Sequence, residues 1–196
     1  MQNNWNNVTV GQFLEIVGLE QDDLSPTEFL LERILIVSGN DYFDTDENEL
    51  NVILKDYKWL DSLPTNKSKQ SFRGLSFGAF IDLNVYCTDS APIENIDKIC
   101  ATIRGFDVLK DECEKIQNES IVNHYATLVS FIEYRTQILN KYKGLFDEDV
   151  DEDEDEDVEP QKPEQTNKWG WQRLIYELCK GDVTKVKDIT STGHIL

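Results

Sequence analysis

A run of acidic residues divides this chain into parts with very different capacities to fold. Between Asp147 and Glu159 eleven of the thirteen residues are Asp or Glu, and none is basic. Such a run repels itself and offers almost no apolar surface to bury, so we expect a disordered acidic linker, which polar residues and prolines extend over residues 147–168. The sequence therefore predicts a folded domain over residues 1–146 and a separate short segment over residues 169–196.

The residues before the linker are numerous enough to enclose a hydrophobic core. A domain of about 145 residues buries about 70% of the surface that its unfolded chain exposes, so it needs no stabilising metal or disulfide. The four cysteines stand far apart, at Cys87, Cys100, Cys113 and Cys179, without the spacing of a metal site. We therefore expect reduced thiols and no metal. The opening MQNNWNN does not resemble a secretory signal, and no apolar stretch is long enough to span a bilayer, which predicts a soluble protein.

Apolar residues recur at helical spacing through the first part of the chain, which predicts a mainly α-helical single domain of about six helices. The clearest helix start is SPTEFLLERILIVSG, where Ser25 is placed as the N-cap, Pro26 takes the first position and Glu28 completes a capping box. Gly39 is placed to end this helix. Further helices are predicted over DENELNVILKDYKWL, over PIENIDKICATIRGF and from about Asn118 to Lys143.

Two stretches of the chain are nearly alike: TVGQFLEI at Thr9–Ile16 and SFGAFIDL at Ser76–Leu83. In each, the hydroxyl residue is expected to cap a helix that begins at the glycine, so that the phenylalanine packs into a shared core. The packing residues predicted in this way are Gly11, Phe13, Gly78 and Phe80. The repeat is consistent with an internal duplication of a helical half, and chance similarity is the alternative.

No combination of residues predicts catalysis. The two histidines, His124 and His194, stand far apart, and no serine, threonine or cysteine lies in a nucleophile motif. No glycine-rich phosphate loop is present. The stretch DTDENELNVILK begins like a calcium loop but lacks the glycine at position six and the glutamate at position twelve. We therefore expect a protein that is not an enzyme, with no cofactor, no metal and no catalytic residues.

The formal net charge of −19 limits the classes of partner. Nucleic acids and anionic membranes are excluded, because binding them requires Lys and Arg to neutralise phosphate. Basic or apolar protein surfaces are the expected partners. One alternative function follows from the acidic run: extended at about 3.3 Å per residue, it matches the charge spacing of about 3.4 Å in a DNA strand. Such a run can mimic nucleic acid and inhibit a protein that binds it.

The segment after the linker predicts an amphipathic helix that must dock. Its docking face is expected to comprise Trp169, Trp171, Leu174, Ile175 and Leu178. A chain of fewer than about 40 residues does not bury such a face by itself. The segment is therefore expected to bind either its own domain or another molecule, as an amphipathic helix in a groove. The sequence leaves open which of the two it is, and it also leaves the oligomeric state open.

Four stretches carry a family resemblance: NWNNVTVGQFLEI, ERILIVSG, LSFGAFIDLNVY and KWGWQRLIYELCKGDVTKVKDIT. They resemble small tailed-bacteriophage virion-morphogenesis proteins of the tail assembly chaperone type. Relative to these proteins, the acidic linker of this chain looks like an insertion. The resemblance implies a protein of the infected bacterial host's cytoplasm that binds the hydrophobic helices of a tape-measure-like client and then leaves the particle. Alternatives are a structural or cargo component of the virion, and an acidic nucleic-acid-mimicking inhibitor of a host protein.

Overall fold

The computed structural model describes residues 4–19, 24–65, 70–72, 74–105, 110–141, 171, 175–176 and 178–191, and residues 147–168 of the predicted linker lie outside them. Every regular element in the described part is a helix, which confirms the mainly α-helical prediction. The α-helices are α1 (Val10–Val17), α2 (Pro26–Ser38), α3 (Glu47–Asp56), α4 (Phe77–Thr88), α5 (Ile96–Ile103), α6 (Lys110–Gln117), α7 (Ile121–Lys141) and α9 (Val186–Thr190). Short 3-10 helices are η1 (Trp5–Asn7), η2 (Lys58–Asp61), η3 (Pro92–Asn95) and η5 (Val183–Lys185). None of these helices is long and apolar enough to cross a membrane.

Helix α2 begins and ends as its sequence predicts. Ser25 Oγ accepts a hydrogen bond from the Glu28 backbone N–H at 3.3 Å, and Glu28 Oε2 accepts one from the Ser25 N–H at 2.9 Å. Gly39 follows with φ +70°, in the left-handed region that favours glycine. Other boundaries differ from the prediction. Helix α7 begins at Ile121 rather than near Asn118, because backbone groups of the residues before it bond to the N-terminal segment.

Both copies of the repeated stretch form capped helices, α1 and α4. Thr9 Oγ1 accepts from the Gln12 N–H at 3.2 Å, and Ser76 Oγ accepts from the Ala79 N–H at 3.2 Å. Each helix begins one residue before its glycine, so the predicted start is off by one residue. Phe13 and Phe80 are 2% and 0% exposed, which confirms their predicted place in the core. The duplication itself stays a prediction.

The N-terminal segment is joined to the turn between α6 and α7. The Val10 N–H donates to the Glu119 carbonyl at 2.9 Å, and the Ile121 N–H donates to the Val8 carbonyl at 2.9 Å. Ser120 Oγ donates to the Asn6 carbonyl at 3.0 Å. These bonds hold α1 beside α6, so the first copy of the repeat belongs to the centre of the body.

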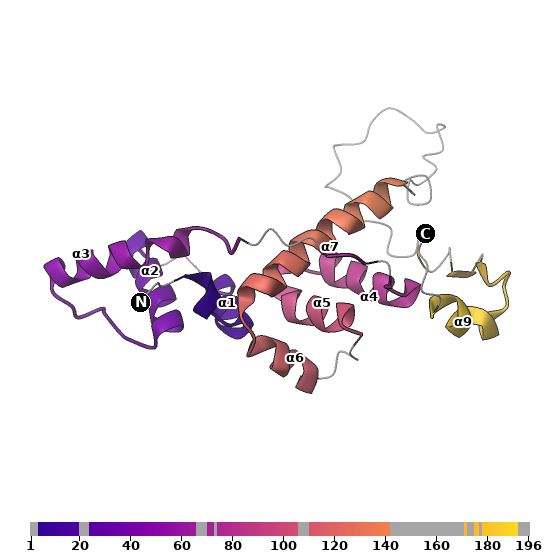
Figure 1. Ribbon diagram of the computed structural model, residues 1–196, viewed down its shortest axis with the longest axis horizontal. Helices are drawn as coiled ribbons and strands as arrows, with labels where there is room; N and C mark the ends of the chain where they lie inside the picture. The colour runs from indigo at the N-terminus through magenta and orange to yellow at the C-terminus, as the bar shows by residue number, and fades with distance from the viewer. Residues whose placement is uncertain are drawn as a thin grey trace, which may run out of the picture.

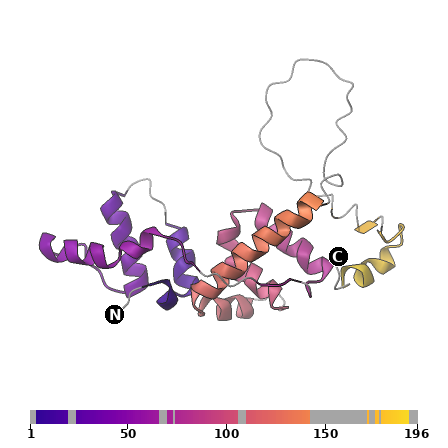
Figure 2. The ribbon, with the colours of Figure 1, turned by 45° about the horizontal axis from the view of Figure 1, so that its top comes forward.

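Helix α7 links two groups of aromatic rings. Its Tyr125 ring lies 6.0 Å from Phe13 of α1, and its Phe131 ring lies 6.2 Å from Phe80 of α4. Figure 1 and Figure 2 show α7 running along the body past α1, α5 and α4, with α3 at one end of the molecule and α9 at the other. The single core therefore has an aromatic centre at each copy of the repeat.

Candidate functional site: the aromatic surface of α4

Trp171 packs against the first turns of α4. Its ring centroid lies 5.2 Å from that of Phe80 and 5.7 Å from that of Phe77, with interplanar angles of 76° and 70°. This edge-to-face arrangement places the positive edge of one ring against the negative face of another. Trp171 is 5% exposed. In the structure, then, the segment after the linker docks on its own domain.

The docked face of this segment differs in part from the predicted one. Trp171, Ile175 and Cys179 are spaced by four residues. Trp171 is buried in the core and Ile175 packs half-buried against it, and Cys179 is buried as well. Leu178, predicted to dock, is 52% exposed. Trp169 and Leu174 lie outside the described residues. Cys179 was not predicted as part of this face, although cysteine behaves as a small hydrophobic residue and completes a row at helical spacing.

A second contact joins the segment to α4 at Gly78. A Cβ atom added at Gly78 would lie 3.2 Å from both Cβ and the carbonyl oxygen of Thr190, the last residue of α9. The glycine therefore permits a backbone approach that any larger residue would obstruct. Figure 1 shows α9 beside the start of α4. The predicted packing residue Gly78 thus contacts the C-terminal segment. A Cβ atom added at Gly11 would instead lie 3.3 Å from the carbonyl oxygen of Gln117 in α6.

Behind Trp171 lies a larger ring cluster that gives the site a rigid floor. Phe80 contacts Phe131 at 6.2 Å and Tyr134 at 6.2 Å between centroids. Phe72, from the segment before α4, contacts the same two α7 rings at 5.7 Å and 5.3 Å. Because these rings come from three parts of the chain, the floor forms only when the body has folded.

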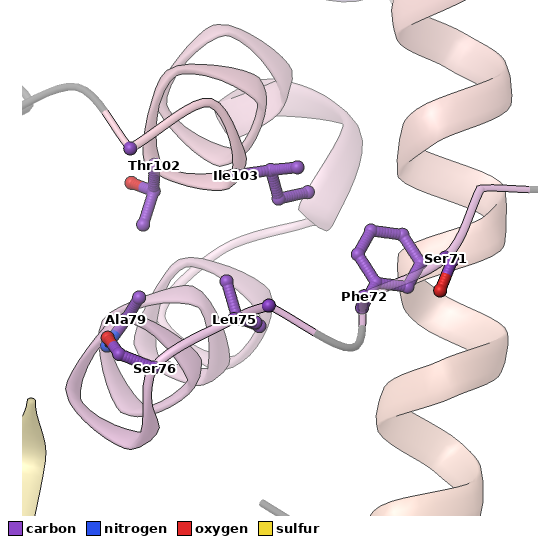
Figure 3. Close-up of a pocket in the computed structure, with 9 residues that line it drawn as sticks. Ser71, Phe72, Leu75, Ser76, Ala79, Thr102 and Ile103 are labelled. Carbon is purple, nitrogen blue, oxygen red and sulfur yellow. The ribbon is translucent and has the colours of Figure 1, made fainter. Parts of the chain in front are cut away.

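A cavity of about 320 Å³ opens on a neighbouring side of the α4 start. Figure 3 shows it between the first turn of α4 and the end of α5, with Phe72 at its far side in front of α7. Its walls combine the apolar side chains of Phe72, Leu75, Ala79 and Ile103 with the hydroxyl groups of Ser71, Ser76 and Thr102. Walls that mix apolar and hydroxyl-bearing side chains can take an apolar side chain with a polar neighbour.

A cluster of perturbed ionisable groups lies where the end of α5 meets the start of α7. Arg104 donates to both carboxylate oxygens of Glu119, at 2.7 and 2.8 Å. These bonds lower the pKa of Glu119 to about 2. His124 is buried, with Nε2 3.0 Å from Glu119 Oε2, and burial lowers its pKa. Its neighbour Cys100 donates to the His124 carbonyl, and burial raises the pKa of that thiol to about 12. This thiol is therefore poorly suited to act as a nucleophile.

The described residues contain no group of three His, Cys, Asp or Glu side chains placed to hold a metal ion. The part of the chain that carries distinctive chemistry is thus the aromatic surface of α4, where Phe77, Gly78 and Phe80 receive the C-terminal segment. We call Phe77, Gly78, Phe80 and the adjoining cavity the α4 site. Comparison of the chain with family models, with curated proteins and with solved structures finds no match.

Proposed function

We propose that the protein is a non-enzymatic bacteriophage virion-assembly protein of the tail assembly chaperone type, which binds hydrophobic helices of a tape-measure-like client at the α4 site. The observation that carries the proposal is the seating of Trp171 between Phe77 and Phe80. A surface that receives a tryptophan-bearing segment of this chain offers the same contacts to a similar helix of another protein. Helix-in-groove binding of this kind uses a few large side chains as anchors.

The cavity beside the α4 site supports the same function. Residues three and four apart in a client helix lie on the same face of that helix. A client helix across the start of α4 can therefore point two such side chains at the two sides of that turn. One large side chain fits where Trp171 lies, and a second enters the cavity lined by Phe72, Leu75 and Ala79. Two anchors in neighbouring pockets fix the register of a client helix.

The charge of the chain supports a holding function. The net charge of −19 repels other copies of a loaded complex, and this repulsion keeps an otherwise insoluble hydrophobic client dispersed. The same charge disfavours membranes and nucleic acids as competing partners. Together with the four stretches that resemble tail assembly chaperones, these properties support assembly work in the cytoplasm of an infected bacterium.

The test is client capture with a substitution in the site and a matched one outside it. Tagged full-length protein is co-expressed with the long coiled-coil product of a neighbouring gene, and the amount of that product retained on the resin is measured. Ala79→Arg places a charge in the cavity and should reduce capture at least tenfold, a loss of about 1.4 kcal/mol in binding. Val52→Arg, at an exposed position of α3, should leave capture unchanged.

Equal capture by both variants would show that the α4 site does not bind the client. Mass spectrometry of purified particles then separates a chaperone from a virion component. A chaperone should be absent from the mature particle, whereas a structural or cargo protein should be present in stoichiometric amount.

A further inference from the structure

The glycines of the two repeat copies contact different kinds of element. At α1, the residue facing Gly11 belongs to α6, and the turn after α6 bonds to the backbone of Val8 and Val10. The neighbour of α1 is thus part of the body. At α4, the residue facing Gly78 is Thr190, which is joined to the end of α7 only through residues 142–170 and the segment that follows. The neighbour of α4 is therefore tethered by a long connection.

Several apolar side chains in the described part of the tethered segment stay exposed, although Ile175 and Ile189 also pack against the core. Trp171 is 5% exposed, but Tyr176 and Leu178 are 61% and 52% exposed, and Val186 is also exposed. Residues of the body core such as Phe80 and Phe131 are 0% exposed. Trp171 and Thr190 attach the segment to the first turns of α4, and Ile175 and Ile189 add half-buried contacts with the core.

We infer that the C-terminal segment is an intramolecular competitor that closes the α4 site and must leave before a client helix binds. The inference rests on the proposed function and concerns the regulation of the same site. A tethered segment competes at an effective concentration in the millimolar range. The apparent affinity for any other helix equals its intrinsic affinity multiplied by the fraction of molecules in which the site is open. A client must therefore bring either higher affinity or several helices to displace the segment.

The residues in contact define the client sequence that competes best. It carries a tryptophan or another large ring to replace Trp171 against Phe77 and Phe80. It also brings its backbone as close to Gly78 as Thr190 does, whose Cβ and carbonyl oxygen lie 3.2 Å from the added Cβ position there.

The experiment uses a fluorescent peptide of residues 169–191 as the probe, added to full-length protein and followed by anisotropy. The chain with Trp171→Ala keeps an intact α4 site but has lost its own anchor, so it should bind the wild-type peptide about tenfold or more tightly than the wild-type chain does. Leu178→Ala is the matched control, because it shortens an exposed residue of the same segment and should leave the peptide affinity at the wild-type value.

A second measurement reports release of the segment directly. Cys179 lies in one row with Trp171 and is 1% exposed, so maleimide labelling of Cys179, located by mass spectrometry, should accelerate in Trp171→Ala. Cys100, in the body core, should stay unlabelled and shows that the body is folded. If Trp171→Ala does label at Cys100, Thr190→Lys replaces it, because this variant puts a charged side chain at the position whose Cβ packs against Gly78.

Equal peptide affinity for the wild-type and Trp171→Ala chains overturns the inference, whether or not Cys179 labelling rises. The outcome is separable from that of the client experiment, because the peptide assay contains no client. If Ala79→Arg loses client capture and the peptide affinities are equal, the proposed function is supported and the inference of an intramolecular competitor is contradicted. If Trp171→Ala binds the peptide more tightly but no variant captures the client, the competitor is supported and the proposed function is contradicted.

Discussion

Glu119 connects three parts of the body through one carboxylate. Its oxygens accept hydrogen bonds from Arg104 at the end of α5, and one of them lies 3.0 Å from Nε2 of His124 on α7. Since an ionised carboxylate only accepts, the neutral imidazole donates from Nε2. This cluster was not predictable beyond a histidine on an apolar helix, because the three residues meet only through the packing of α5 on α7.

The cluster predicts a loss of stability in acid. Burial lowers the pKa of His124, so below about pH 6.5 the unfolded chain takes up a proton that the folded chain does not, and the free energy of unfolding falls. Glu119, whose pKa is about 2 in the fold, adds a second loss as the pH falls from about 4.5. Because this carboxylate is half-exposed, that loss is on the order of 1 kcal/mol.

Urea unfolding at pH 7.5, 5.5 and 3.5 measures both losses. His124→Gln retains an amide donor for Glu119 but does not titrate, so this variant should keep its stability between pH 7.5 and 5.5 while the wild type loses part of it. The same slope in both proteins would assign the loss to other groups.

Individual residues of the α4 site were predictable to different degrees. The positions of Phe13, Phe80 and Trp171 in the core or on a docking face follow from spacing alone. Leu178 shows the limit: a helical face defined by apolar residues at positions i, i+3, i+4 and i+7 is wider than the row that a partner covers. Which row is covered depends on the surface opposite, and that surface is formed by residues distant in sequence.

At the scale of elements, helices with capping signals were predictable and a helix without them was not. Helix α2 has its capping box and terminal glycine where the sequence places them. Helix α6, KDECEKIQ, was not predicted, because five of its eight residues are charged and only Cys113 and Ile116 mark an apolar side. Ile116 is 1% exposed, so tertiary packing on α1 and α5, not periodicity, defines this helix.

The two repeat glycines should respond differently to the same substitution. Gly11→Ala places a methyl group 3.3 Å from the Gln117 carbonyl, and the backbone bonds after α6 prevent that carbonyl from yielding. We expect the free energy of unfolding to fall by about 1–2 kcal/mol. Gly78→Ala meets Thr190 instead, which can move away with its tethered segment, so the body should keep its stability or gain up to about 1 kcal/mol.

Urea unfolding followed by circular dichroism compares the two glycine variants with the wild type. Faster maleimide labelling of Cys179 in Gly78→Ala, with no change at Cys100, should accompany the unchanged unfolding curve. A Gly78→Ala protein as unstable as Gly11→Ala would mean that α9 is an integral part of the core.

A separate prediction concerns the cap of α2. Ser25→Ala removes the acceptor for the Glu28 N–H, and the free energy of unfolding should fall by about 1 kcal/mol. Ser25→Asp keeps a capping acceptor and should restore most of the loss, which urea unfolding at neutral pH will measure. Equal losses in both variants would indicate that the cap is not the cause.

At the scale of the whole molecule, the helical class was predictable, but the arrangement was not. Figure 2 shows the C-terminal segment at the end of the body opposite α3, beside the start of α4. Sequence reasoning left docking on the domain and docking on another molecule equally open, since a segment's apolar face does not identify its partner. Only the packed surface of Phe77 and Phe80 identifies it.

Removal of residues Asp147–Glu159 tests the function of the acidic run. If the protein is an assembly chaperone, the deletion should leave client capture within about twofold of wild type, because the α4 site is intact and a factor of two is well under 1 kcal/mol. An inhibitor that mimics nucleic acid should lose its activity with these charges. Pull-down of the client and competition for a basic nucleic-acid-binding protein measure the two outcomes on the same variant.

The order of α4 and Trp171 along the chain has a consequence during translation. Trp171 leaves the ribosome thirty residues after Lys141, the end of the helix α7 whose rings complete the floor of the α4 site. At 5–20 residues per second, the nascent protein spends about two to six seconds with this floor synthesised and its cover still unsynthesised. In that interval a helix from a neighbouring polysome meets no rival, so capture is favoured on chains still being made over chains already released.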